Sequence, residues 1–262
     1  MIKVAVCGLG RTGSEVIRAI RDSDRFSLTA AFCRPGSEKA GKDVGTLLQS
    51  VPIGILAQDI TQSEQVFNDT EIDVVIDFSN PASAKPLLRA CKKRRIPIVF
   101  CTTGYTEADL IWMSDFVAHN NLGVVYAPNV TLGVNVLLAA LKIVARALPE
   151  FDYLITETHH NKKFDIPSGT AKKIAGTIRK ELPKDAEVPI HSARVGGYVG
   201  VHTVLLASDS ERLSLTHESF NRSAFASGAL RAAKFILGKS GWYEMEDVLG
   251  FADVLERAAS AV

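Results

Sequence analysis

The segment from Glu157 to Ala171, ETHHNKKFDIPSGTA, gathers two histidines, two lysines and the expected start of a helix in a short stretch of chain. Ser168 suits the cap of a helix N-terminus, and the residues after it would present unpaired backbone N–H groups that can hold a carboxylate. Neighbouring side chains on a strand alternate between faces, so His159 and His160 should diverge, one moving protons and the other binding. This pattern predicts proton transfer on a small acid.

The alternative is structural: the histidines would end a strand as satisfied polar groups, and Lys162 and Lys163 would form a solvated turn. A metal site is not expected, because no cysteine lies nearby, no HExxH helix occurs and the adjacent lysines would repel a cation. The chain also lacks GxSxG and any other recognisable setting for a serine or cysteine nucleophile. The sequence therefore gives no support to hydrolase chemistry.

A second motif, GLGRTG at residues 8–13, directly follows the first expected strand and opens the first expected helix. In this setting Gly8 permits a tight turn, Gly10 lets a pyrophosphate approach the backbone, and Gly13 lets helix and strand pack closely. The N–H groups at the helix start add positive potential for phosphates. A glycine turn without a ligand is the alternative, but the N-terminal placement favours a dinucleotide.

The second strand ends at Arg34, where sites that prefer NAD usually carry Asp or Glu. With no carboxylate to repel it, a 2′-phosphate could pair with Arg34 and with Arg11 through charge-assisted hydrogen bonds. We therefore expect NADPH as the preferred cofactor, with NADH as a second one. Alternatively, Arg34 is a solvated arginine before the Pro35-Gly36 turn.

Three later strand ends carry turns of small residues, at 77–79, 101–104 and 127–129. In an open α/β sheet the ligand lies outside the carboxyl ends of the strands, so these turns should converge on the nicotinamide half of the cofactor. Each turn alone is weak evidence, but three in succession favour the functional interpretation. The candidate cofactor-binding residues are Gly8, Leu9, Gly10, Arg11, Thr12, Gly13, Arg34, Cys101, Thr102, Thr103, Ala127, Pro128, Asn129 and Val130.

The composition is that of a globular protein whose partners are small molecules. The chain has 30 basic and 29 acidic residues and a formal net charge of +1, which gives no field that would favour nucleic acid or an anionic membrane. The N-terminus has no secretory pattern and no apolar run is long enough to span a membrane, so we expect a cytoplasmic location. The four cysteines form no CxxC pair and should be buried free thiols.

The elements that must position these motifs fall into two patterns. As far as Pro128, short β-branched runs alternate with helical segments, which predicts an α/β domain with a Rossmann-like, doubly wound parallel sheet. A long apolar helix over Leu132–Leu148, a strand ending in the two histidines, a helix from about Gly169 and two more strands then predict an α+β domain with a mixed sheet. A helix ending at Gly238 and a helical segment over Met245–Ser260 complete the chain.

The whole chain resembles the dihydrodipicolinate reductase (4-hydroxy-tetrahydrodipicolinate reductase) family of lysine biosynthesis. The motifs that carry the resemblance are VAVCGLGRTG, DFSNP, TTG, APNVTLGVN, the HH/K/PSGTA segment, RVGG, VGVHT, FASGALRAA and WYEMEDVLG. The resemblance implies a dinucleotide-binding domain of residues 1–128 plus 238–262, and a substrate-binding and tetramerisation domain of residues 129–237. It also implies NAD(P)H-dependent reduction of 4-hydroxy-tetrahydrodipicolinate (dihydrodipicolinate) to tetrahydrodipicolinate, a cyclic dicarboxylate of the diaminopimelate and lysine pathway, by a homotetramer.

Position by position, the resemblance gives His159 the role of proton donor and acceptor and Lys163 that of a second proton donor. The residues that match substrate-carboxylate binders are His160, Ser168, Gly169 and Thr170. Four positions depart from the family pattern: Thr158 and Ile166 stand where Ala is common, Cys101 where Gly is common, and Val201 where Glu is common. Because Ile166 adds bulk beside the PSGT loop, a reductase of the same fold for another small cyclic imino or oxo acid stays open as an alternative. A non-catalytic nucleotide sensor is a further alternative, which conflicts with the pair of His159 and Lys163, since a sensor has no use for a positioned proton donor.

Overall fold

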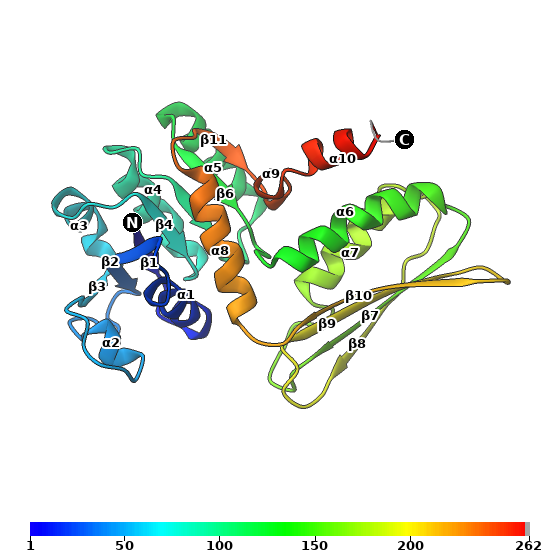
Figure 1. Ribbon diagram of the computed structural model, residues 1–262, viewed down its shortest axis with the longest axis horizontal. Helices are drawn as coiled ribbons and strands as arrows, with labels where there is room; N and C mark the ends of the chain where they lie inside the picture. The colour runs from blue at the N-terminus through cyan, green and yellow to red at the C-terminus, as the bar shows by residue number, and fades with distance from the viewer. Residues whose placement is uncertain (260–262) are drawn as a thin grey trace. The chain divides into compact units, whose positions relative to one another are not determined.

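The computed structural model describes residues 1–259 and divides the chain into two compact units (Figure 1). Unit 1 comprises residues 1–130 and the chain from Phe225 onward, and unit 2 comprises Thr131–Ala224. The second boundary lies well before the residue 237/238 expected from the sequence. The reason is the close contact of the intervening helix with unit 1, since a Cβ added to Gly228 would lie 1.8 Å from the carbonyl oxygen of Val130.

Seven parallel strands form the sheet of unit 1, in the order β11-β6-β5-β4-β1-β2-β3. The central strands β4 and β5 are buried along their whole length, as in a parallel sheet that is covered on both faces. This arrangement confirms the predicted Rossmann-like fold. The strands are β1 Ile2–Cys7, β2 Phe26–Cys33, β3 Ala57–Asp59, β4 Val74–Asp77, β5 Ile98–Phe100, β6 Gly123–Tyr126 and β11 Gly241–Tyr243.

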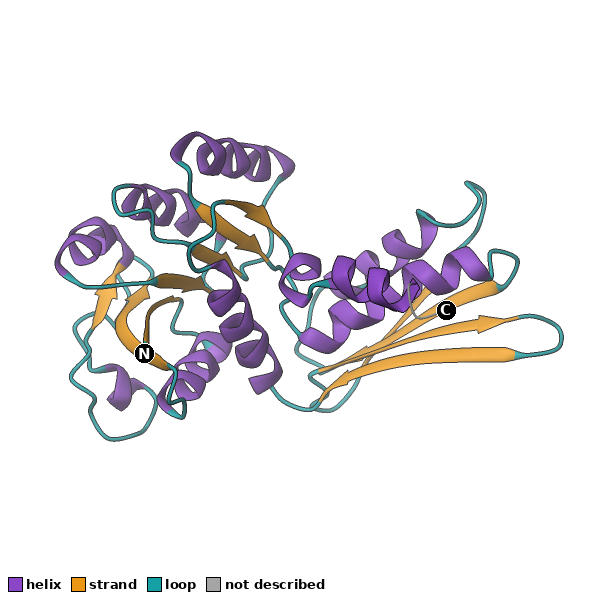
Figure 2. Cartoon of the chain, turned by 45° about the horizontal axis from the view of Figure 1, so that its top comes forward, coloured by secondary structure: helices purple, strands orange, loops and turns teal. Residues whose placement is uncertain are grey.

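Helices lie on both faces of this sheet (Figures 1 and 2). Helices α3, α4 and α5 pack side by side on one face, over a core that includes Phe32, Phe67 and Phe100. The final helical segment is two helices, because Gly250 adopts a left-handed φ of 64° between them; the predicted end of that segment, Ser260, lies outside the described residues. The helices are α1 Arg11–Arg21, α2 Val44–Leu47, α3 Ser63–Asp69, α4 Ala84–Lys92, α5 Glu107–Asn120, α8 Ser223–Ile236, α9 Met245–Leu249 and α10 Phe251–Ala259, with short 3₁₀ turns η1 Ile60–Gln62 and η2 Pro81–Ser83.

Unit 2 is a mixed sheet with two helices, as predicted, but the sheet has four strands where the sequence indicated three, because β8 was not predicted. Its strand order is β10-β9-β7-β8, and β7 pairs parallel with β8 and antiparallel with β9. Helices α6 and α7 pack together over an apolar core that includes Tyr153, Ile155 and Val204. The elements are α6 Leu132–Ala147, β7 Asp152–His159, α7 Gly169–Arg179, β8 Ile190–Arg194, β9 Gly200–Ala207 and β10 Arg212–Ser219. Over the described residues of both units, no helix combines the length and apolar character needed to cross a bilayer.

Candidate active site

The carboxyl end of β7 carries a buried polar cluster. Along this strand every second residue is buried, so Glu157 and His159 lie on the same face as the apolar Tyr153 and Ile155. The antiparallel register pairs Glu157 with His202 of β9, which brings that histidine to the same face. The alternation of side chains along β7 therefore places these polar residues on one face. The apolar core under α6 and α7 holds the strand that carries them.

Both carboxylate oxygens of Glu157 are engaged. Oε2 is hydrogen-bonded to Nδ1 of His159, while Oε1 accepts from Nη2 of Arg194 at 2.8 Å and from the backbone N–H of Ser168 at 3.2 Å. The rings of His159 and His202 meet edge to face with centroids 5.1 Å apart, and Nε2 of His202 lies 3.2 Å from Oγ of Ser168. Glu157, His159 and His202 are 1%, 7% and 4% exposed, so water screens these contacts little.

The charges in this cluster follow from burial and from its partners. Burial alone would raise the pKa of Glu157, but hydrogen bonds from Arg194 and its other donors lower that pKa to about 2. Burial lowers the pKa of His159 below its ordinary value, although the carboxylate of Glu157 opposes this effect. Burial, together with the neighbouring His159, lowers the pKa of His202 to about 4. At neutral pH the cluster therefore holds an ionised carboxylate beside neutral imidazoles.

The loop between β7 and α7 brings other predicted residues to this cluster. Ser168 caps α7 as expected, because its side chain accepts from the N–H of Ala171 at 3.1 Å. Nζ of Lys163 pairs with both carboxylate oxygens of Asp165 at 2.6 and 2.8 Å, and Nη2 of Arg194 holds the Asp165 carbonyl at 2.6 Å. Gly169 and Thr170 form the first turn of α7, next to the cap.

His160 lies just past the end of β7, where its backbone N–H donates to the carbonyl of Tyr198 at 2.7 Å. His160 is half-buried and follows the last residue of β7, so it is not part of the buried row that carries Glu157 and His159. The sequence alone did not single out Arg194 and His202, and it gave Glu157 no role. All three enter the cluster through strand pairing, which no local motif reveals.

A cation is a poor fit for this cluster. The nearest ligand atoms of Glu157, His159 and His202 lie within 4.8 Å of one another, which is close enough for joint ligation. However, the carboxylate already carries the guanidinium of Arg194, and both Arg194 and Lys163 act on His159 as neighbouring positive charges. The donor set therefore suits proton transfer better than metal binding.

The glycine loop of unit 1 has the shape that its sequence predicts. Gly8 has a left-handed φ of 95°, and a Cβ added there would lie 2.4 Å from the carbonyl oxygen of Phe78. A Cβ added to Gly13 would lie 1.8 Å from the carbonyl oxygen of Gly8, whereas one added to Gly10 would meet no atom within 4 Å. The loop is thus packed tightly from behind and open at Gly10, beside the start of α1. This open cradle fits the pyrophosphate of a dinucleotide.

The other candidate cofactor residues of unit 1 follow β2, β5 and β6, whose carboxyl ends lie along the same edge of the parallel sheet as that of β1. The fully buried carboxylate of Asp77 accepts from Oγ1 of Thr102 at 2.7 Å and from Oγ of Ser79, so it ties the ends of β4 and β5 together. Cys101, Ala127 and Val130 are buried, while Arg11, Arg34 and Thr103 are exposed. The carboxyl edge of the sheet therefore gathers the predicted set.

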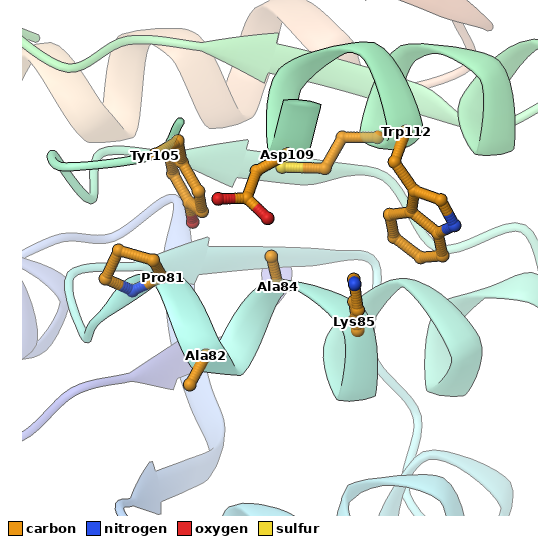
Figure 3. A pocket seen from close by; sticks show the side chains of 8 residues that line it. Pro81, Ala82, Ala84, Lys85, Tyr105, Asp109 and Trp112 are labelled. Atoms are coloured by element: carbon orange, nitrogen blue, oxygen red, sulfur yellow. The ribbon is translucent and has the colours of Figure 1, made fainter. Parts of the chain in front are cut away.

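A separate pocket of about 220 Å³ lies between the starts of α4 and α5 (Figure 3). Tyr105 and Asp109 line one side of it, and Pro81 lies across from them. Nζ of Lys85 lies 5.1 Å from the ring centroid of Trp112 at the same pocket. None of the predicted site residues lines this pocket, so it is distinct from the glycine loop.

Comparisons with known proteins show to which family the chain belongs. The family description "Dihydrodipicolinate reductase, N-terminus" matches residues 2–130, and "Dihydrodipicolinate reductase, C-terminus" matches residues 133–249. The chain belongs to the dihydrodipicolinate reductase family. This membership confirms the resemblance drawn from the motifs.

Relatives of the family match over nearly their whole length. A protein of Methanocaldococcus jannaschii named 4-hydroxy-tetrahydrodipicolinate reductase is 34% identical over 97% of this chain and 99% of its own. One of the same name from Geotalea daltonii is 35% identical, with 95% and 99% covered.

Solved structures share the fold. "Dipicolinate bound Dihydrodipicolinate reductase" from Paenisporosarcina sp. TG-14 has a TM-score of 0.75 at 23% identity, covering 93% of this chain and 97% of that one. An amine dehydrogenase from Mycobacterium smegmatis has a TM-score of 0.67 at 11% identity, covering 91% and 93%. At these identities the likeness concerns the architecture alone.

Proposed function

We propose that the protein is an NAD(P)H-dependent oxidoreductase that reduces 4-hydroxy-tetrahydrodipicolinate to tetrahydrodipicolinate in diaminopimelate and lysine biosynthesis. The observation that carries the proposal is the Glu157–His159 pair beside the capped N-terminus of α7, which joins a proton-handling group to a carboxylate site. The names of the curated relatives support the substrate. The overall reaction consumes a hydride and a proton and releases the 4-hydroxyl group as water.

The carboxylates of the substrate would bind at the start of α7. The backbone amides of Gly169 and Thr170 and the cap residue Ser168 form the helix N-terminus, which favours negative charge. Lys163, now paired with Asp165, supplies a cation next to this site, and His160 follows the same strand end. The helix N-terminus and these cationic side chains would together hold the substrate ring in one orientation for reduction.

His159 and Lys163 would supply protons. The nicotinamide cofactor, when bound, supplies the hydride to a conjugated carbon of the substrate ring. Charge then develops at the other end of the conjugated system, where an acid within hydrogen-bond reach must deliver a proton. His159→Gln should lower kcat by about 10²–10⁴-fold, the range typical of general acid catalysis, and leave the Kd of the cofactor unchanged. An equal loss of both would give His159 a structural role.

NADPH is the proposed preferred cofactor, with NADH as a second one. The exposed guanidinium groups of Arg34 and Arg11 belong to the predicted set at the carboxyl edge of the sheet, and the strand that precedes Arg34 ends without an acidic side chain. Arg34→Ala should reduce the ratio of kcat/KM with NADPH to kcat/KM with NADH by about tenfold or more, because one charge-assisted hydrogen bond is worth about 1.5–3 kcal/mol. An unchanged ratio would remove Arg34 from the cofactor site.

A homotetramer is the proposed assembly, formed through the face of the unit 2 sheet that α6 and α7 leave uncovered. Residues of this face are exposed or half-buried within the described chain: Leu154, Thr156, Thr158, Val201, Thr203, Leu205 and Thr216. A sheet face with leucine and valine among threonines suits a permanent contact with other copies. Leu205→Lys should lower the mass measured by light scattering, whereas the matched control Leu213→Lys, on the helix-covered face, should not; a monomeric wild type would contradict the proposal.

The decisive assay couples the protein to the condensation enzyme that generates the unstable substrate, and follows the oxidation of NADPH and NADH by absorbance. Cofactor oxidation that depends on the condensation product, with inhibition by planar pyridine-2,6-dicarboxylate, is the expected result. Oxidation with another cyclic imino or oxo acid in place of this substrate would favour the alternative reductase. Absence of both oxidation and dicarboxylate binding would refute the proposed function.

A further inference from the structure

Glu157 occupies the centre of the buried cluster, yet no proton-transfer or binding role falls to it in the proposed reaction. Its side chain is almost completely buried, so it offers no exposed atom to a substrate. One oxygen bonds to the ring of His159, and the other bonds to Arg194 and to the backbone of Ser168. The residue thus touches both the proton-handling and the carboxylate-binding halves of the site.

We propose that Glu157 is a positioning residue that fixes the tautomer and orientation of His159, so that Nε2 is the nitrogen which exchanges a proton with the substrate. An ionised carboxylate can only accept hydrogen bonds, so Nδ1 of His159 must carry the hydrogen between them. When the protonated ring gives up its Nε2 proton to the substrate, it becomes the neutral Nδ1–H tautomer, which the same hydrogen bond holds. The proposal builds on the proposed reductase function.

The surroundings of the ring support this assignment. A Cβ added to Gly200 would lie 3.0 Å from Nε2 and 3.3 Å from Cδ2 of His159, so glycine at this position keeps a side chain away from Nε2. The ring of His202, which also lies near Gly200, packs edge to face against the ring of His159. With the carboxylate at Nδ1, the imidazole is oriented by three neighbours from β7 and β9.

The charges around His159 explain why an acidic neighbour is needed at this position. Lys163 in the following loop and Arg194 on β8 disfavour a positive charge on the ring, as does its burial. His202 on β9 also faces the ring, but its pKa is lowered to about 4, so it is neutral at pH 7. The carboxylate of Glu157 on β7 acts in the opposite direction and favours the protonated ring. Glu157 therefore keeps the pKa of His159 from falling further, and Arg194 limits how strongly it does so.

Glu157 also sets the distance between the two halves of the site. Its Oε1 accepts from the N–H of Ser168, and Arg194, which bonds to the same oxygen, also holds the carbonyl of Asp165. A substitution of the carboxylate therefore changes the hydrogen bonding at the start of α7 as well as at the imidazole of His159. Such shared support is how an outer residue controls the geometry of groups that it does not itself react with.

Two substitutions with opposite expected effects test the proposal. Glu157→Gln removes the carboxylate and should lower the pKa of His159 by about 1–2 units, the usual effect of one nearby charge. It should also move the alkaline limb of the kcat/KM profile to lower pH and reduce kcat by about 10²–10⁴-fold. Arg194→Gln leaves the carboxylate uncompensated and should raise the pKa of His159. Glu187→Gln, at an exposed glutamate of the same unit, is the matched control and should change neither.

Nuclear magnetic resonance of ¹⁵N-labelled histidine reads the pKa and the tautomer directly, with the His159 signals assigned by their absence in His159→Gln. In the wild type the neutral ring should carry its hydrogen on Nδ1, and in Glu157→Gln the amide can donate, so the Nε2–H form should grow. Thermal melts follow the folding of each variant. If Glu157→Gln does not fold, the pKa of His159 in Arg194→Gln still tests the proposal, because it should rise.

The outcomes separate this inference from the proposed function. An unchanged tautomer and pKa in Glu157→Gln, or shifts of the same sign in both variants, would overturn the positioning role whatever the protein reduces. Opposite shifts would uphold that role even if the protein left 4-hydroxy-tetrahydrodipicolinate unreduced, which would refute only the proposed substrate. A lower melting temperature with an unmoved pH profile would make Glu157 merely structural.

Discussion

Two alanine substitutions in the glycine loop should have opposite effects on folding and on cofactor binding. Gly10 and Gly13 belong to one motif, but a Cβ at Gly10 would point into open space, whereas a Cβ at Gly13 would meet the backbone of Gly8. Gly10→Ala should therefore fold normally and bind NADPH weakly. Gly13→Ala should lose stability first, because its added methyl group meets the protein itself.

The magnitudes follow from the two environments. At Gly13 the added carbon would lie 1.8 Å from a carbonyl oxygen, so α1 and the end of β1 must separate by about 1 Å, and overpacking of this kind costs about 1–3 kcal/mol. At Gly10, which caps α1 with a φ of −85°, alanine fits the backbone and should cost less than about 1 kcal/mol. A methyl group in the cradle would remove about one charge-assisted hydrogen bond to phosphate, worth about 1.5–3 kcal/mol, or roughly 10–150-fold in Kd.

Calorimetric titration with NADPH and thermal melts without cofactor measure the two effects separately. For a protein of this size, each 1 kcal/mol should move Tm by about 2–4 °C, so Gly13→Ala should melt visibly earlier than Gly10→Ala. If Gly10→Ala bound NADPH as tightly as the wild type, the loop would not hold the pyrophosphate. Equal melting temperatures for Gly13→Ala and the wild type would refute the packing argument.

Three further predictions concern burial. Gly200→Ala should cover Nε2 of His159 and lower kcat while leaving the Kd of NADPH unchanged, as steady-state kinetics and titration would show. The pKa of Glu157 in the folded chain, about 2, lies below its ordinary 4.5, so its charge stabilises the fold above pH 4.5 and this contribution is lost as the pH falls toward 2. Between pH 4.5 and pH 2, the free energy of unfolding measured in urea should therefore fall by about 3 kcal/mol less in Glu157→Gln than in the wild type. Burial, with the nearby Asp77, raises the pKa of the Cys101 thiol, so iodoacetamide should label it only after unfolding.

The sequence was sufficient for the elements whose signal is local. The alternation of apolar strands with helices predicted the parallel sheet, and the cap at Ser168 placed the start of α7. The short edge strands β3, β8 and β11 were not predicted, because three to five residues carry too little periodicity. Unit 2 ends earlier than the sequence pattern suggested because the close packing of Gly228 on Val130 is a contact between distant parts of the chain.

The same distinction applies to the site. The motif predicted His159, Lys163 and Ser168 as neighbours because they share one strand end and one loop. Arg194 and His202 lie far along the chain and reach Glu157 only through the pairing of β7 with β8 and β9. The register in which these strands pair depends on turns and core packing, which cannot be deduced from a single sequence.

The period of two along β7 also explains how roles divide within ETHH. Glu157 and His159 fall on the buried face, where a carboxylate can hold an imidazole away from water, while the next residue, His160, falls outside that row. Moving the pair by one residue would expose both groups to solvent, which would weaken the carboxylate's effect on the ring. The spacing E-x-H is therefore as much a requirement of the site as the identity of the two residues, and a spacing of E-H would not replace it.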